Sequence, residues 1–193
     1  MEDTIHFLGI SGSLRKGSYN TSLLNAAAGL LPEGVSMDII SIADIPLYNG
    51  DLDLPVTAER PESVKKLRDA MAKADGILLV SPEYNYSIPG TLKNAIDWAS
   101  RGKDSPMLQK GVALMGATPG LWGTVRMQLA FHPVFQFLNM RVVLKPEVLV
   151  NQAASKFDES GKLTDEKSIQ LVREKLEALK KVCQEQKQAS PVS

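Results

Sequence analysis

The residues from Ile5 to Thr21, IHFLGISGSLRKGSYNT, contain the strongest indication of the fold. They begin with a short apolar run over Ile5–Ile10, which is typical of a buried strand in a parallel sheet. A loop rich in hydroxyls, glycines and cations follows, and apolar residues at helical spacing begin near Asn20. A strand, a glycine-containing loop and a helix in this order predict the start of a βαβ unit and therefore an α/β fold.

Apolar runs and helical patterns continue to alternate along the chain. The predicted strands are Ile5–Ile10, Val35–Ile42, Gly76–Val80, Val112–Gly116 and Val142–Val150. Helices are predicted from Asn20, after Pro61, around Leu92–Ala99, over Thr124–Leu138 and from Asp165. Pro146 cannot donate a ladder hydrogen bond, so the last strand is expected at an edge. We therefore predict a three-layer α/β sandwich whose five-stranded parallel sheet has the order 2-1-3-4-5.

Composition limits the class of protein. The 193 residues, of which 44% are hydrophobic, suit a single domain over 1–187 with a flexible tail at 188–193. Lys plus Arg and Asp plus Glu number 22 each, so the zero net charge gives no electrostatic case for a nucleic acid or an anionic membrane. The apolar runs fall far short of the roughly 20 residues of a membrane helix, and no basic leader opens the chain. A cytoplasmic protein is expected.

The loop Ser11–Thr21 is the first candidate for a binding site. In this architecture ligands bind at the carboxyl ends of the strands, where the winding reverses between the first and third strands. The free N–H groups and the dipole at the start of a helix favour an anion. From Thr4 to Pro32 the chain has no Asp or Glu that could supply one. An external anion is therefore predicted, and the alternative is a solvated turn in which Asn20 caps the helix.

The identity of the anion follows from motifs that do not fit. Gly12 and Gly17 have the spacing of the nucleoside-triphosphate loop G-x-x-x-x-G-K-[ST], but Ser18 stands where that loop needs lysine. The dinucleotide fingerprint G-x-G-x-x-G also fails, because Gly9 is followed by Gly12 without the matching glycines. With these two motifs excluded, the predicted anion is a monophosphate, which hydroxyls, backbone amides and one arginine would hold.

Two further loops are expected at the same edge of the sheet. In Pro82–Gly90, Tyr84 offers a flat apolar face and Asn85 could bind the edge of a pyrimidine, although Tyr84 and Tyr86 could instead be core aromatics. In Gly116–Thr124, the glycines allow the backbone to approach a ligand closely. The long irregular segment Asp51–Glu62 is a candidate lid.

Three motifs carry a resemblance to a known family. They are GSLRKGSYN from Gly12, SIADIPLYN at Ser41–Asn49 and SPEYNYSIPGTLKNAIDWAS at Ser81–Ser100. From about Phe7 to Glu147 the chain resembles the NADPH-dependent FMN reductase family of flavodoxin-like proteins, specifically its bacterial chromate and quinone reductase branch. The resemblance implies that the phosphate of flavin mononucleotide (FMN) is held by Ser13, Arg15, Ser18, Asn20 and Thr21. It also implies an isoalloxazine lined, largely through backbone, by Pro82, Glu83, Tyr84 and Asn85, with Thr118 to Gly120 closing the pyrimidine or ribityl side.

The implied function is electron transfer from NADPH or NADH to quinones, chromate or other small oxidants. The flavin carries the chemistry, so no catalytic side chain is expected. Because donor and acceptor would share one exposed flavin face, ping-pong kinetics are predicted. Two alternatives remain: a reductase that releases reduced FMN to a partner monooxygenase, and a flavodoxin-type electron carrier. Flavodoxins are usually strongly acidic, so the zero net charge argues against the carrier.

The remaining candidates for chemistry are interpreted as structural. His6 lies in the first predicted strand and His132 in the fourth predicted helix, and no cluster of His, Asp or Glu has the spacing of a metal site. Cys183, the sole cysteine, lies on the apolar stripe of the last helix and is expected in the core.

A homo-oligomer is predicted through the third and fourth helices. Apolar residues from Met127 to Leu138 surround more than one face of the fourth helix, and Trp98 lies off the Leu92–Ala99 stripe and is expected to point away from the core. The resemblance implies a dimer or tetramer, with Arg126 and Glu147 as a charged pair between subunits. The alternative is that Asp51–Glu62 covers this surface within one chain.

Overall fold

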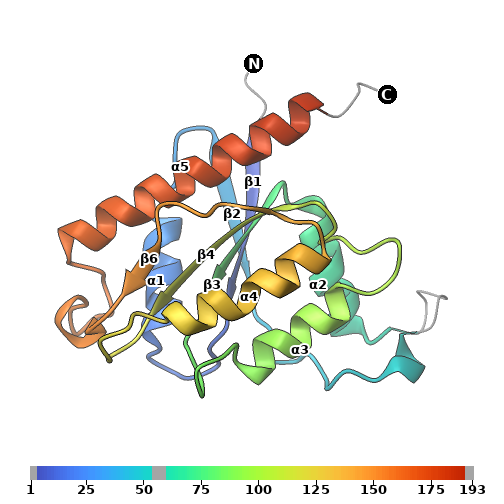
Figure 1. Cartoon of the computed structure of the whole chain (residues 1–193), viewed down its shortest axis with the longest axis horizontal. Helices are drawn as coiled ribbons and strands as arrows, with labels where there is room; N and C mark the ends of the chain where they lie inside the picture. Colours follow the sequence, from blue (N-terminus) through green and yellow to red (C-terminus); the bar gives the residue numbers. More distant parts are fainter. Residues whose placement is uncertain (1–3, 54–59, 190–193) are drawn as a thin grey trace.

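The computed structural model describes residues 4–53 and 60–189 and has three layers, with a parallel sheet between two layers of helices (Figure 1). The strands are β1 (Ile5–Ser11), β2 (Val35–Ile40), β3 (Gly76–Val80), β4 (Gly111–Ala117), β5 (Arg141–Val142) and β6 (Val148–Val150). The helices are α1 (Tyr19–Ala28), α2 (Glu62–Lys73), α3 (Gly90–Ala99), α4 (Val125–Phe137) and α5 (Glu166–Ala189). In the described part of the chain, the 3-10 turns are η1 (Gly50–Leu52) and η3 (Ala153–Ser155).

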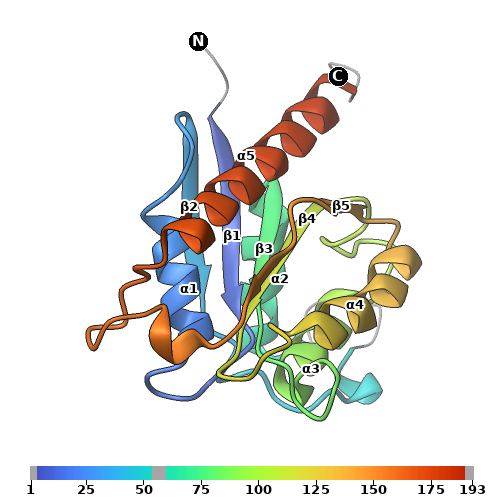
Figure 2. The ribbon, with the colours of Figure 1, turned by 60° about the vertical axis from the view of Figure 1, so that its left-hand side comes forward.

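The strand order is β2-β1-β3-β4-β5, with β6 also beside β4, and every pairing is parallel. The predicted order is thereby confirmed. After β1 the chain moves to β2 on one side, and it later returns to β3 on the other side of β1. The winding therefore reverses between β1 and β3, and the carboxyl ends of both strands lie at the lower edge of the sheet in Figure 2.

The edge of the sheet differs from the prediction. The expected single strand Val142–Val150 is two short strands, β5 and β6, so the sheet has six strands and not five. The backbone of Val143 still donates to Val112 O (2.9 Å), and the chain then leaves β4 until Val148. Pro146, which has no N–H to donate, lies in this break and is preceded by a cis peptide bond. β2 also ends at Ile40, earlier than predicted.

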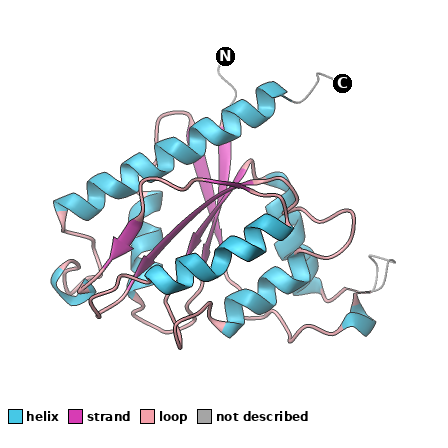
Figure 3. Cartoon of the chain, viewed as in Figure 1, coloured by secondary structure: helices cyan, strands magenta, loops and turns pink. Residues whose placement is uncertain are grey.

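Alternate residues of the buried strands face two separate cores. Along β3, Leu78 and Val80 pack with α1 and α5, whereas Ile77 and Leu79 pack with α2, α3 and α4. Every residue of β3 and β4 is buried, because helices cover both faces of the sheet (Figure 3). This sandwich holds the strand ends in fixed positions and leaves the loops beyond them at the surface.

One prediction about the third helix is corrected. Trp98 is fully buried: its indole N–H donates to Pro46 O (2.8 Å), and the ring of Tyr48 packs edge-on against it, with centroids 4.9 Å apart. The expectation that it points away from the core was wrong, because the chain segment before η1 covers it. On α4, Phe135 belongs to one buried stripe, while Phe137 is 80% exposed.

Three boundaries also differ. The candidate lid Asp51–Glu62 begins inside η1 and ends at the first residue of α2, and residues 54–59 lie outside the described part of the chain. The predicted tail at 188–193 begins inside α5, and residues 190–193 are not described. Thr124 precedes α4 as its N-cap and is not its first residue. Within the described residues no helix is long and apolar enough to cross a membrane.

Candidate functional site

The start of α1 is arranged to receive an anion. Ser18 is the N-cap, and its Oγ accepts from the backbone N–H of Asn20 (3.2 Å). Asn20 is therefore not the cap, and the alternative of an Asn20-capped turn was wrong. The N–H groups of Tyr19 and Thr21 have no acceptor among the described residues, and the first turn has no acidic residue. The positive end of the helix is left for a ligand.

Hydroxyls and one flexible cation surround this helix end. Ser11 Oγ lies 2.9 Å from Thr21 Oγ1, and the buried Ser13 Oγ is 3.4 Å from the backbone nitrogen of Arg15. The exposed side chain of Arg15 donates from Nη2 to Gly17 O at 3.0 Å. Because this contact is local and exposed, the guanidinium can turn toward a bound anion. Ser11 was missed as part of the cluster, although its place directly after an apolar strand was a usable signal.

Asn20 connects the first loop to the third. Its Nδ2 donates to Ala117 O (2.9 Å), and its Oδ1 accepts from Ala117 N (2.8 Å). Both partners are buried, so the side chain acts as a short extension of the sheet at the end of β4. Asn20 was predicted to bind the phosphate. In the structure, its side chain instead holds α1 against the loop that follows β4.

The second loop presents its tyrosines to solvent. Tyr84 and Ser87 exchange backbone hydrogen bonds (3.1 and 2.9 Å), and the residues between them, Asn85 and Tyr86, have φ of 50° and 62°. This is the pattern of a type I′ turn. Tyr84 and Tyr86 are both exposed, so the alternative that they are core aromatics was wrong. A flat ring could bind against the exposed face of Tyr84.

Glu83 has a role that the sequence did not indicate. Its Oε2 accepts from the backbone N–H groups of Arg126 (2.9 Å) and Met127 (3.1 Å), and its Oε1 accepts from Arg126 Nη1 (3.3 Å). The carboxylate therefore caps α4 from a distant loop and fixes the second loop against that helix. A lining contact of Glu83 with the isoalloxazine would have to come from its backbone.

The third loop is fixed by the end of β6 and the residues that follow it. Thr118 N donates to Val150 O (2.9 Å), Gly120 O accepts from Gln152 N (2.9 Å), and Gly120 N lies 3.3 Å from Thr118 Oγ1. Gly123, with φ of 60°, packs so closely on Leu149 that a Cβ there would lie 2.8 Å from Leu149 Cβ. A rigid backbone of this kind can approach a ligand without a side chain in between.

Thr124 marks a strained point at the end of this loop. It is a β-branched residue with φ of 70°, a conformation that costs roughly 1–3 kcal/mol. Its hydroxyl is buried and has no partner among the described residues. The hydroxyl fits beside Gly116, where a Cβ would collide with it. Thr124 was not predicted as a site residue, and its conformation leaves no signal in the sequence.

The three loops meet at one edge of the sheet, below the strand ends in Figure 1. Gly12 N donates to Val80 O (2.8 Å), and a Cβ at Gly12 would lie 2.5 Å from Ser81 Oγ, so the first and second loops are in close contact. The fold thus places all eleven predicted site residues on these adjacent loops and in the first turn of α1. The donor set fits FMN: unpaired helix N–H groups, hydroxyls and Arg15 suit a phosphate, and exposed Tyr84 suits a planar ring.

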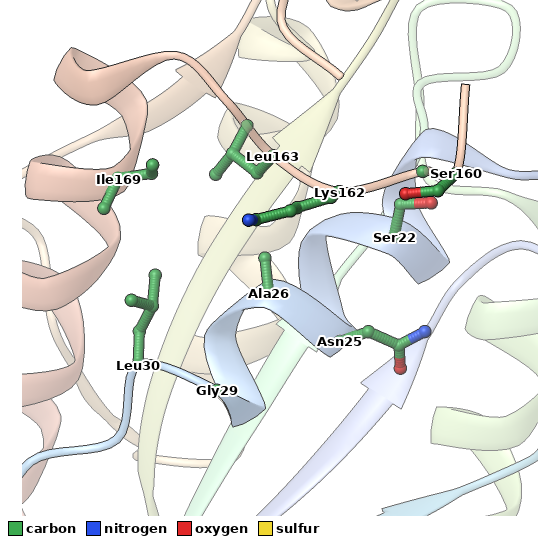
Figure 4. Close-up of a pocket in the computed structure, with 10 residues that line it drawn as sticks. Ser22, Asn25, Ala26, Gly29, Leu30, Ser160, Lys162, Leu163 and Ile169 are labelled. Carbon is green, nitrogen blue, oxygen red and sulfur yellow. The ribbon is translucent and has the colours of Figure 1, made fainter. Parts of the chain in front are cut away.

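A separate groove lies along the outer face of α1. Its volume is about 440 Å³, and Figure 4 shows Ala26, Leu30, Leu163 and Ile169 around its apolar part, with Ser22 and Ser160 close together at one end. It contains none of the predicted site residues, because it runs between α1 and the chain before α5 and not across the strand ends.

The other candidate residues have ordinary structural surroundings. His6 Nδ1 lies 2.9 Å from Ser36 Oγ, and its Nε2 lies 3.3 Å from Asp38. Cys183 is buried, and burial raises the pKa of its thiol to about 12, which keeps it protonated and unreactive. In the described part of the chain, no three His, Cys, Asp or Glu side chains are grouped closely enough to hold a metal ion.

Comparisons with known proteins identify relatives of this chain. Residues 5–155 match the family model of the NADPH-dependent FMN reductases. An NAD(P)H-dependent FMN reductase of Pseudomonas aeruginosa is 44% identical over 93% of this chain and 95% of its own length. An NAD(P)H:quinone oxidoreductase of Solanum tuberosum is 41% identical over 92% of both chains. The solved structure of FerB, a flavoenzyme NAD(P)H:(acceptor) oxidoreductase of Paracoccus denitrificans, has a TM-score of 0.83 at 30% identity, over 94% of this chain and 98% of that one.

The chain therefore belongs to the NADPH-dependent FMN reductase family, a class of flavin-dependent oxidoreductases with a flavodoxin-like fold. The resemblance seen in the sequence motifs is confirmed, and with it FMN as cofactor and NAD(P)H as electron donor.

Proposed function

We propose that the protein holds FMN at the three-loop site and reduces quinones with electrons from NAD(P)H. The overall reaction is NAD(P)H + H⁺ + quinone → NAD(P)⁺ + hydroquinone, which transfers two electrons and two protons to the quinone. The observation that carries the proposal is the open start of α1, where N–H groups and hydroxyls lack an internal carboxylate. Bound FMN would supply hydride acceptance and electron transfer at this edge.

The chain's own residues would bind and orient the cofactor. Ser13, Arg15, Ser18 and Thr21 would hold the phosphate, while Asn20 keeps α1 in place through Ala117. The backbone of Pro82–Asn85 would line the ring, and Glu83 would keep that loop rigid by capping α4. The backbone of Thr118–Gly120 would close the pyrimidine side. Backbone donors near that side would stabilise the negative charge that reduction adds.

The names of the relatives favour quinones as acceptors, since the Solanum tuberosum protein is an NAD(P)H:quinone oxidoreductase. Chromate remains a prediction of the sequence motifs. Two measurements separate the proposed enzyme from its alternatives. A yellow protein after purification distinguishes held FMN from FMN that is released as a product. Steady NAD(P)H oxidation with a quinone and no partner protein distinguishes an enzyme from an electron carrier. A colourless protein without such activity would overturn the proposal.

We further propose a ping-pong mechanism, because nicotinamide and quinone need the same exposed face. Initial rates at several fixed NAD(P)H concentrations should give parallel double-reciprocal lines, with inhibition by excess quinone. Intersecting lines would demand a ternary complex and would reject the shared face.

We also propose a homo-oligomer. Because Trp98 is buried, the contact surface would consist of other residues of α3 and α4 that are exposed. A groove of about 260 Å³ runs between α3 and α4, and the exposed Phe137 is one of the residues that line it. Within one chain Arg126 contacts Glu83, and Glu147 contacts Lys145 (3.0 Å), so their pairing between subunits stays a prediction. Phe137→Lys should lower the mass measured by light scattering. A wild-type mass near 21.0 kDa would reject the oligomer.

A further inference from the structure

A hairpin between β6 and α5 packs against the outer face of α1 and forms one wall of the separate groove described above. Phe157 and Leu163 pair across this hairpin. Gly161, near its tip, has φ of 81°, and a Cβ there would lie 2.9 Å from Ser22 Oγ, so the tip contacts the first turn of α1. The groove of about 440 Å³ begins at this contact, and Ile169 of α5 belongs to its far end (Figure 4). We call it the α1 groove.

One cation extends over the α1 groove. Figure 4 shows the side chain of Lys162 crossing it from the hairpin, and this side chain is exposed. Its ammonium group makes no hydrogen bond or ion pair with another described residue. The hydroxyl of Ser22, which is half-buried at one end of the groove, is likewise without a hydrogen-bond partner in the described part of the chain. The groove therefore offers one positive charge and one hydroxyl whose donors are free.

No acidic side chain balances this charge within the groove. Among the described residues that line it there is no Asp or Glu. Asp158, in the same hairpin, binds its own turn: Oδ1 accepts from Ser160 N (2.9 Å), Lys162 N (2.9 Å) and Ser160 Oγ (2.6 Å). These hydrogen bonds, above all the one from the Ser160 hydroxyl, lower the pKa of Asp158 and keep its charge within the turn. An anionic ligand would thus meet a free ammonium group and no lining carboxylate.

The rest of the α1 groove is apolar and elongated. Ala26, Leu30 and Ile169 are half-buried, and Leu163 is buried. An alkyl chain in contact with these side chains would be removed from water, which is favourable in proportion to the apolar area that is buried. From Ser22 to its last residue, α1 rises about 9 Å, which matches the length of a medium alkyl chain such as that of octanoate. The volume of about 440 Å³ is within the range of small-molecule sites.

We propose that the α1 groove is a binding site for an amphipathic monocarboxylate, such as a medium-chain fatty acid. The carboxylate accepts hydrogen bonds from Lys162 Nζ and Ser22 Oγ, and the alkyl chain lies along Ala26, Leu30 and Ile169. Charge and length decide between this ligand and the alternatives, because a neutral alkyl ligand leaves Lys162 unpaired and an acetate-sized anion leaves the apolar surface in water. The site is separate from the three loops at the strand ends and takes no part in the proposed electron transfer.

Binding of three probes tests this site without electron transfer. Calorimetry on the oxidised, FMN-loaded protein without NAD(P)H compares octanoate, the neutral 1-octanol and acetate. We expect octanoate to bind at least about fivefold more tightly than octanol, because a hydrogen bond to a charged group stabilises a complex more than a neutral one. Acetate, which lacks the alkyl chain, should bind at least about tenfold more weakly than octanoate. Shifts of the methyl NMR signals of Ala26, Leu30 and Ile169 should locate octanoate in the groove.

Substitutions in the groove separate its charge from its apolar surface. Lys162→Gln should reduce the affinity for octanoate to about that for octanol and change the affinity for octanol by less than about twofold. Lys162→Arg, which keeps a cation, should retain most of the preference. Ala26→Leu places a larger side chain in the groove and should weaken both probes at least about tenfold, while leucine keeps the helix propensity of this position high. Thermal unfolding and the spectrum of bound FMN check that each variant is folded.

Lys167→Gln is the matched control. It removes an exposed lysine in the first turn of α5 that does not line the groove, so both affinities should stay unchanged. Equal affinities for octanoate and octanol, or a Lys162→Gln variant that keeps the preference, would overturn the inference. Unchanged octanoate binding in Ala26→Leu would place the ligand elsewhere, and a lower mass by light scattering in this variant would assign the groove to subunit contact; both results also overturn it. Absence of quinone reduction would reject the proposed function alone.

Discussion

The starts of α1 and α4 lie at the same edge of the sheet, but in the described part of the chain only the start of α4 has a carboxylate of the protein bound to its N–H groups. At α4, the carboxylate of Glu83 reaches across from another loop and accepts two backbone N–H groups. At α1, the cap is the neutral hydroxyl of Ser18, and the first turn has no acidic residue. Both helix ends carry the same partial positive charge, so the difference lies in what the chain provides to balance it.

This difference supports the proposal that the start of α1, and not the start of α4, binds a ligand. The end of α4 is already satisfied by the protein, and it serves to hold the second loop. The end of α1 keeps unpaired N–H groups beside hydroxyls and Arg15, which supports our proposal that an external phosphate binds there. Four substitutions test this contrast, in order of decreasing expected effect.

Placing a carboxylate at the start of α1 should make it resemble α4. Thr21→Glu should raise the Kd for FMN by at least about 100-fold, because the new charge repels the phosphate and competes for the same N–H groups. The protein without FMN should lose no stability and could gain about 0.3–1 kcal/mol from the helix dipole. FMN titration and thermal unfolding measure the two effects. Thr21→Gln is the neutral control, and an equal loss of affinity in it would remove charge as the cause.

Removing the amide that ties α1 to the end of β4 should lower stability. Asn20→Ala leaves the buried N–H and C=O of Ala117 without their partners, at a cost of about 2–3 kcal/mol. The free energy of unfolding in urea, measured without FMN, checks this value. An unchanged unfolding midpoint would mean that the bridge contributes nothing to the apoprotein and that Asn20 acts on the cofactor alone.

Arginine and lysine in the first loop should differ in their effect on FMN. Arg15→Ala should weaken FMN binding by about 30-fold, since a guanidinium gives forked, charged hydrogen bonds to a phosphate. Lys16→Ala should have an effect below about threefold, because a solvated ammonium gives a weak surface interaction. Fluorescence titration of FMN measures both. If the two variants bind FMN equally well, Arg15 has no special place at the phosphate.

Weakening the internal cap of α4 should give the smallest change. Glu83→Gln keeps the shape but loses the charge, so stability should fall by about 1–2 kcal/mol. The matched control is Glu62→Gln in the exposed first turn of α2, where the loss should be below about 0.5 kcal/mol. Urea unfolding compares them. Equal losses in both variants would show that Glu83 acts only as an ordinary first-turn acid.

The site could be predicted in outline but not in detail. Adjacent loops were identified because parallel strands end at one edge and the loop motifs are long. The bond from Glu83 to α4 joins residues 43 positions apart, and the amide pair of Asn20 spans 97 positions. No periodicity or local motif reports contacts of that separation. Trp98 was misplaced for a similar reason, because its cover comes from Pro46 in a segment without regular structure.

The sequence by itself determined the α/β fold class, the strand order and the absence of acidic residues in the first loop. These features follow from local hydrophobic patterns, proline positions and charge, all of which can be counted along the chain. The tertiary structure alone decided that Glu83 would neutralise α4 while α1 stayed open, that the last strand would divide into β5 and β6, and that Arg126 would stack on Tyr86 and Trp122. The physical reason is that such pairings depend on where loops of different strands meet, and this is set only once both faces of the sheet have been packed.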